Sequence, residues 1–270
     1  MKKTAALVVL VLSAVVSLLV AAPSYSAVQF RIAFTASGVF PRVAPSLSYG
    51  TLGNALPNGA LVSIACEQRG TPVTNIYGET ISIWERLSNG TWVPNSFVNT
   101  GHSGWTPGVP RCTYSRVAAA TWADANETVP ISGVDPDNQC AAFVSMALWA
   151  GGVPMSSAWN LDYRSGLQFI RADTMFRQAA ALGLGSISPI SYADPSAGAA
   201  ANGDVIGYDW NNDLVIDHVA MVTGVSNSVA TVTQRSAAQQ GRPWNYSWAA
   251  GAPLPTVYPG SKVWLLRVRT

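Results

Sequence analysis

A run of eleven residues from Cys140 to Ala150 is apolar or small at every position except Ser145. A run of this length and composition predicts a helix that is buried on most of its circumference. Polar residues suited to N-capping precede the run, and two glycines and a proline follow it, at positions 137, 138, 151, 152 and 154. These signals place Cys140 in the first turn of the predicted helix.

The residues before this helix show strand character instead. Short apolar or alternating runs are separated by turn signals such as Pro57-Asn58-Gly59 and Ser88-Asn89-Gly90. The expected strands are 28–35, 61–66 and 80–87, with a last pair around 92–98. No helical period appears, so this part is predicted to be a small all-β barrel.

After residue 112 the pattern changes from helical to strand-like. Apolar residues at helical spacing predict helices over 114–125 and 165–182, and 187–204 reads as a small-residue loop. Four β-rich runs follow, at 204–208, 218–225, 229–234 and 262–268. Helices followed by an antiparallel run indicate the α+β class.

The composition supports two modest domains behind a secretory signal. With 49% hydrophobic and 11% charged residues, the chain can bury a real core. Lys2 and Lys3 precede an apolar run and then small residues, which is typical of a signal peptide over 1–27. We therefore expect a secreted protein with a β domain over 28–100, a Gly- and Pro-rich linker over 101–112, and a second domain over 113–270.

Removing the signal would leave 14 basic and 14 acidic residues. A near-neutral protein has no electrostatic footprint for nucleic acid or an anionic membrane, so neither is expected as a partner. The sequence shows no cofactor motif, and it leaves the oligomeric state open.

Three cysteines in a secreted chain imply one disulfide and one remaining thiol. Pairing Cys66 with Cys112 leaves Cys140 free at its helix start, and we favour that pairing. Counting alone leaves the alternative pair Cys112–Cys140 open.

Two residues carry the candidate chemistry. At a helix start, unpaired N–H groups and the helix dipole favour a thiolate, which predicts a lowered pKa for Cys140. His218 enters an otherwise apolar strand and needs a polar partner there, and a nearby thiol would provide one. The other histidine, His102, lies in the linker and is expected to be solvated.

The first half resembles a bacterial Src-homology-3-like domain. The resemblance rests on Arg42-Val43-Ala44-Pro45, on Leu56–Cys66, and on Trp84–Val93 as closing strands. It covers about residues 37–100 and implies either a module that binds cell-wall peptides or a spacer without a ligand.

The second half resembles the bacterial secreted "putative amidase" domains, relatives of the CHAP and NlpC-type cysteine peptidases. The resemblance rests on the order of three motifs: Gln139–Leu148, Asn202–Ile206 and Asp217–Thr223. It implies a papain-like domain in which a helix carrying Cys140, the nucleophile, packs on an antiparallel sheet carrying His218, the general base. The implied activity is hydrolysis of amide bonds, often those of peptidoglycan.

The resemblance implies a third catalytic residue, and position at the helix start suggests an oxyanion site. Where relatives carry a polar residue that orients the imidazole, this chain offers Gln234, followed by Arg235 in place of a histidine. We expect the oxyanion to be held by the backbone N–H of Cys140, with a second donor from Gln139 or Asn138. Four aromatic residues are candidates to line a substrate groove: Trp149, Trp159, Tyr208 and Trp210.

The sequence gives little support for a metal-dependent or serine-dependent catalytic site. Two separated histidines and no Cys-x-x-Cys exclude a standard zinc site, and no Gly-x-Ser-x-Gly elbow is present. Two alternatives to a peptidoglycan amidase stay open: an acyl-transferring relative that uses the same thiol, and a cell-wall binding protein without activity.

Overall fold

The computed structural model describes residues 28–47, 51–131, 134–154, 171–247 and 249–269. The predicted signal peptide, Trp159 and the first part of the helix expected over 165–182 lie outside these residues. Among the described residues, no helix has the length and apolar character needed to cross a bilayer.

The first domain is built on a four-stranded antiparallel sheet. Its strands, in the order β1-β2-β3-β4, are Val28–Arg31, Leu61–Thr74, Thr80–Leu87 and Trp92–Pro94. Inward-facing apolar side chains form its core, among them Ile32, Ile64, Leu87 and Val93. The expected all-β character is confirmed, and the Src-homology-3-like identity stays a prediction.

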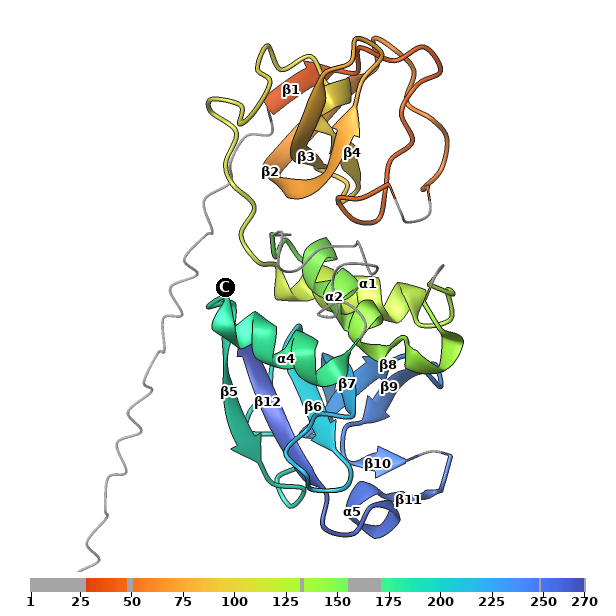
Figure 1. Cartoon of the computed structure of the whole chain (residues 1–270), viewed down its shortest axis with the longest axis vertical. Helices are drawn as coiled ribbons and strands as arrows, with labels where there is room; N and C mark the ends of the chain where they lie inside the picture. The colour runs from red at the N-terminus through yellow and green to blue at the C-terminus, as the bar shows by residue number, and fades with distance from the viewer. Residues whose placement is uncertain (1–27, 48–50, 132–133, 155–170, 248, 270) are drawn as a thin grey trace, which may run out of the picture.

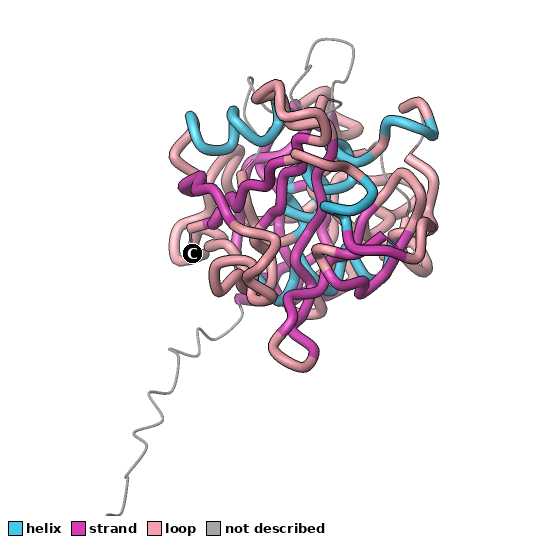
Figure 2. Tube along the Cα trace, turned by 90° about the horizontal axis from the view of Figure 1, so that it is seen from below, coloured by secondary structure: helices cyan, strands magenta, loops and turns pink. Residues whose placement is uncertain are grey.

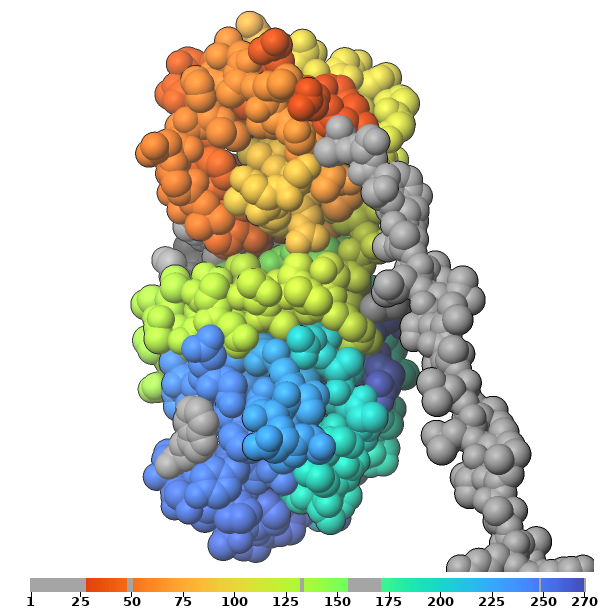
Figure 3. Space-filling view, turned by 180° about the vertical axis from the view of Figure 1, so that it is seen from behind, coloured from red at the N-terminus to blue at the C-terminus, as the bar shows by residue number. Residues whose placement is uncertain are grey.

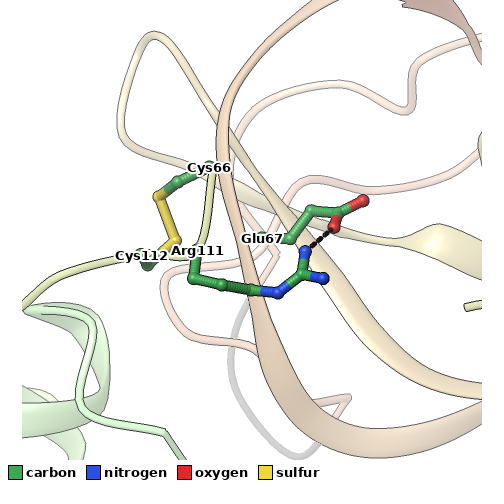
Figure 4. The surroundings of a disulfide bond; sticks show 4 residues. All are labelled: Cys66, Glu67, Arg111 and Cys112. Carbon is green, nitrogen blue, oxygen red and sulfur yellow. Dashed lines mark hydrogen bonds and ion pairs between the residues drawn. A yellow bond between two sulfur atoms is a disulfide. The ribbon is translucent and has the colours of Figure 1, made fainter. Parts of the chain in front are cut away.

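The segment that precedes the second domain is fastened to β2. Cys66 and Cys112 form a disulfide with an S–S distance of 2.04 Å, as favoured from the sequence, and Cys140 is free. Beside it, Arg111 Nη1 lies 2.7 Å from Glu67 Oε2, and Figure 4 shows the two links side by side. The disulfide and the ion pair therefore hold residues 111–112 along β2.

The second domain contains a six-stranded sheet in the order β5-β12-β6-β7-β8-β9, with every neighbouring pair antiparallel. Its strands are Gly185–Ile190, Lys262–Val268, Val205–Asp209, His218–Ser226, Val229–Gln234 and Gln239–Pro243. Left-handed backbone at Asn227 and Ser228 forms the tight turn between β7 and β8. The expected α+β class is confirmed, and the papain-like arrangement stays a prediction.

Each face of this sheet packs into its own core. Helices α1 (Arg116–Asn126), α2 (Cys140–Ala150) and α4 (Ala172–Ala181) cover one face, where alternate residues such as Val219 and Met221 point toward them. The opposite face packs Tyr208 and Val222 against Trp244 and Leu254. The short elements β10 (Tyr246–Ser247), β11 (Ala252–Pro253) and α5 (Leu254–Val257) lie at the lower end of the molecule in Figure 1, the end from which Figure 2 is seen.

The helix α2 is buried along its whole length, as its composition predicts. Gly152, with φ +105°, ends it in backbone that side chains rarely adopt, and a Cβ there would meet the Thr113 carbonyl oxygen at 2.8 Å. The expected N-caps are wrong. Pro136–Asn138 form a 3₁₀ turn capped by Asp135, and Gln139 then leads directly into the helix without a side-chain cap.

Two further elements differ from expectation. The strand β5 runs into the start of the region predicted as a loop, 187–204, and it pairs with β12 along its whole length. Pro189 obscures it in the sequence, because proline weakens a strand pattern and is tolerated on an edge strand. The strand β9 has no signal in the sequence, since its residues are polar, glycine or proline. In the space-filling view of Figure 3, the helical segment lies between the first domain and this sheet.

Candidate active site

Cys140 is the first residue of α2 and is 8% exposed. The backbone N–H of Val219 lies within hydrogen-bonding reach of its sulfur, as do the N–H groups of Ala141 and of Cys140 itself. Val219 directly follows His218 at the start of β7. The fold therefore brings the thiol to the strand end that carries the histidine, although 77 residues separate the two.

His218 is half-buried and is held from the neighbouring strand β8. Its Nε2 lies 3.1 Å from Oε1 of Gln234, the last residue of β8. The residue predicted to orient the imidazole is thus the one that contacts it. His102 is exposed, as expected for a residue without a role in the site.

A buried arginine, Arg242 on β9, determines which atom is the donor in the hydrogen bond between His218 and Gln234. Its Nε and Nη2 both donate to Oε1 of Gln234, and the Nε contact is 2.9 Å long. A guanidinium can only donate, so the Gln234 atom facing it is the oxygen, and His218 must donate from Nε2. The neutral imidazole then carries its lone pair on Nδ1, the nitrogen left to accept a proton from a thiol.

Burial sets the charge of both candidate catalytic groups. It lowers the pKa of His218 to about 4, with help from the positive charge of Arg242, while the Gln234 contact opposes the shift. Burial also raises the pKa of the Cys140 thiol, although three backbone N–H groups favour its thiolate. The expected lowered thiol pKa is wrong, because this helix start lies in the core and away from water. At neutral pH the resting pair is a thiol and a neutral imidazole.

The structure contradicts one of the two expected oxyanion donors and leaves the other as a prediction. The side-chain amide of Gln139 is 2% exposed and donates to the carbonyls of Ile131 and Val134, at 3.2 and 3.0 Å. It is therefore not available to an oxyanion, and this expectation is contradicted. Asn138 is exposed and donates to Asp135 Oδ2 at 3.3 Å, and its role stays a prediction.

Gln139 instead anchors the start of α2 to the two residues that follow β8. Its backbone N–H donates to Ser236 Oγ at 2.8 Å, and its Oε1 accepts from Arg235 Nε at 2.5 Å. Arg235 also donates to the carbonyl of Glu127. Arg235, which stands where the family that the chain resembles carries a histidine, thus positions Gln139, the residue directly before Cys140.

A cavity of about 230 Å³ opens beside His218. Trp210 and Tyr258 form a stacked aromatic pair on its wall, with ring centroids 4.3 Å apart. Asp217 holds Trp210 there by accepting its backbone N–H at 2.7 Å. The cavity is further lined by polar side chains, among them Gln234, Ser236, Gln239, Arg242 and Ser247.

Of the three aromatic residues expected in a substrate groove that the structure describes, Trp210 alone lines this cavity. Trp149 and Tyr208 are fully buried, so the groove role expected of them is wrong. Their size favours core packing, and Tyr208 donates its hydroxyl to the Trp244 carbonyl at 2.8 Å. Trp159 lies outside the described residues.

Sequence reasoning missed Arg242 and Ser236. Arg242 follows a glycine and precedes a proline in a polar stretch, which gives no signal of a buried strand. Within the described part of the chain, no three His, Cys, Asp or Glu residues gather as metal ligands.

Comparisons with known proteins give a family. A model of the "putative amidase domain" matches residues 113–256, which is more than half of the chain. No curated protein matches the sequence. A solved structure of NlpC2 from Trichomonas vaginalis is similar at 13% identity, over 90% of this chain and 73% of that one, with a TM-score of 0.34. The family match is the finding that identifies the chain: it belongs to the putative amidase domain family.

Proposed function

We propose that this protein hydrolyses amide bonds with Cys140 as nucleophile and His218 as general base. The observation that supports this most is the meeting of the two residues at one place, with the sulfur against the Val219 N–H and the imidazole next to it in the chain. Membership of an amidase family gives the class of bond. Gln234 orients the imidazole through Nε2.

The reaction would proceed by proton transfer within this pair. As the sulfur of Cys140 attacks the amide carbonyl carbon, Nδ1 of His218 takes the thiol proton. The tetrahedral intermediate collapses, the C–N bond breaks, and the imidazolium returns that proton to the leaving amine. Water then attacks the thioester carbonyl carbon and His218 takes a proton from the water; the C–S bond breaks, the imidazolium returns the proton to the Cys140 sulfur, and the product acid is released. The first turn of α2 supplies backbone N–H groups for the oxyanion.

Peptidoglycan peptides are the proposed substrate, and the outside of the cell is the proposed location. The signal-like N-terminus supports secretion, and the family resemblance supports a cell-wall peptide. The aromatic wall beside His218 suits a substrate with sugar or peptide groups, because rings of Trp and Tyr pack on the apolar faces of both. The first domain is proposed as a module that docks on the same polymer.

The test compares the full chain with its Cys140→Ala variant on purified peptidoglycan and on defined muropeptides. We expect mass spectrometry to show new amine and acid ends with the wild type, and no products with the variant at an unchanged melting temperature. Products formed equally by both proteins would reject the thiol mechanism. A wild type that binds the polymer and cleaves no amide would favour the binding alternative.

A further inference from the structure

Arg242 is an arginine in the protein interior, 3% exposed, with every contact to an uncharged group. Besides Gln234, its Nη1 reaches the carbonyls of Pro243, Trp244 and Tyr246, at 3.1, 3.3 and 2.9 Å. Its Nη2 lies 3.4 Å from the hydroxyl of Tyr208. Among the described residues, no carboxylate lies within ion-pair distance of it.

Burying a guanidinium without a charged partner costs folding free energy, so stability by itself does not explain Arg242. A buried charge loses its hydration, and an apolar side chain of similar size is often as stable or more so. Two of the N–H groups of Arg242, on Nε and Nη2, meet at the single oxygen of Gln234 that also faces His218. That convergence suggests a role in the site.

We propose that Arg242 is a positioning residue for catalysis, which locks the Gln234 amide so that its oxygen faces His218 Nε2 and Nδ1 remains the basic nitrogen. Without the guanidinium, the amide is held by the longer contact from Gln234 Nε2 to the Ala237 carbonyl, at 3.3 Å, and we expect a fraction of it to turn by 180° and present its NH₂ group to the imidazole. The imidazole would then carry its proton on Nδ1, and that nitrogen could not accept the thiol proton. This inference rests on the proposed Cys140–His218 mechanism.

The charge of Arg242 has a second effect on the same imidazole. The groups around His218 are Tyr208 from β6, Gln234 from β8 and Arg242 from β9, and the Val219 N–H next to it in the chain lies against the Cys140 sulfur. The neighbouring acid on its own strand end, Asp217, is bound to the Trp210 N–H. Arg242 is thus the permanent cation among these groups, and it disfavours the imidazolium. Removing it raises the pKa of His218, so the acid limb of the activity profile moves to higher pH.

The test uses nitrogen NMR of histidine in the full chain, because the protein has two histidines and a His102→Asn background leaves the signal of His218 alone. In the wild type we expect the Nε2–H tautomer. In Arg242→Met we expect a mixture of tautomers, a higher titration midpoint, and a kcat at least 10-fold lower with little change in KM. Arg242→Lys keeps the charge, and we expect it to keep the low midpoint while losing part of kcat.

Arg267→Met is the matched control, since this half-exposed arginine contacts only loop carbonyls and Asp204 away from the site. It is expected to leave tautomer, pH profile and kcat unchanged. Should Arg242→Met fail to fold, Gln234→Glu provides a second measurement: its carboxylate cannot donate, so the Nε2–H tautomer persists while the titration midpoint rises. An unchanged tautomer and profile in the Arg242 variants, with hydrolysis still dependent on Cys140, would overturn this inference and leave the proposed function standing.

Discussion

Nε2 of His218 lies 3.1 Å from Oε1 of Gln234, and the same oxygen accepts two hydrogen bonds from a buried arginine. The side chain that orients the imidazole is therefore itself fixed in one orientation. An imidazole held in one tautomer is ready for proton transfer before substrate binds. This is one form of active-site preorganisation.

This relationship predicts the effect of shortening the orienting side chain. Gln234→Ala removes the acceptor for Nε2–H, so we expect kcat for amide hydrolysis to fall about 10²- to 10⁴-fold, as when a catalytic histidine loses its tautomer. Steady-state kinetics on a muropeptide measure the loss. Gln239→Ala, in the wall of the same cavity, is the control. Comparable losses in both variants would mean that Gln234 acts through the cavity's shape.

The pKa values predict a broad pH profile. His218 has a pKa lowered to about 4, so its neutral, basic form is present above about pH 4. The Cys140 pKa is raised, so the thiol keeps its proton until alkaline pH. We expect kcat/KM to rise with a midpoint near pH 4 and to stay level through neutral pH. An acid limb near pH 6.5, the ordinary value for histidine, would contradict the burial that we describe.

A pair of buried glutamates in the first domain predicts a stabilising substitution. Glu67 and Glu85 face each other across β2 and β3, both fully buried. Burial and the neighbouring Glu67 raise the pKa of Glu85 well above 4.5, so the folded state holds a proton that the unfolded chain releases. Stability from this group is complete below about pH 4.5 and is lost as pH rises through the folded pKa.

Glu85→Gln mimics the protonated carboxyl and keeps the acceptor for Asn95 Nδ2, which lies 2.6 Å from Glu85 Oε1. We expect the variant to melt at a higher temperature than the wild type at pH 8, and at the same temperature near pH 4. Each unit of pKa elevation corresponds to about 1.4 kcal/mol. Calorimetry at the two pH values checks this, and a variant less stable at pH 8 would refute the proton held by Glu85.

The disulfide is predicted to matter for stability and not for the chemical step. Cys66 and Cys112 are 46 residues apart in sequence, and closing a loop of that length is worth about 4 kcal/mol in the chain-entropy estimate. We expect the double variant Cys66→Ser, Cys112→Ser to melt at a lower temperature and to keep its kcat on a small muropeptide at 20 °C. Loss of kcat in a protein that is still folded would link the bridge to the active site.

Sequence pattern predicted those parts of the fold and site that depend on local signals. The apolar run of α2 and the alternation in β7 and β8 follow from periods of side-chain burial, so both were located in advance. Gln234 could be assigned because the family that the chain resembles carries an orienting polar residue on the strand after the histidine. Pro189 and the polar residues of β9 obscured two strands that form only because neighbouring strands offer them partners.

The electrostatics of the site could not be predicted in this way. The position of Cys140 at a helix start favours a thiolate, but the sequence does not reveal that this start is buried, and burial decides the direction of the pKa shift. Gln139 has the right chemistry for an oxyanion donor, yet its amide is used by carbonyls at 131 and 134. Arg242 reaches the site through tertiary pairing of β8 and β9 alone.

The proposed mechanism requires a thioester intermediate on Cys140. Wild-type protein mixed with a muropeptide and quenched in acid within the first turnover should show, by intact mass, the acyl part of the substrate added to the chain, with peptide mapping placing it on Cys140. The Cys140→Ala protein should show no such addition and no hydrolysis. Amide hydrolysis by the wild type without any acyl mass on Cys140, or an equal turnover by Cys140→Ala, would contradict the account.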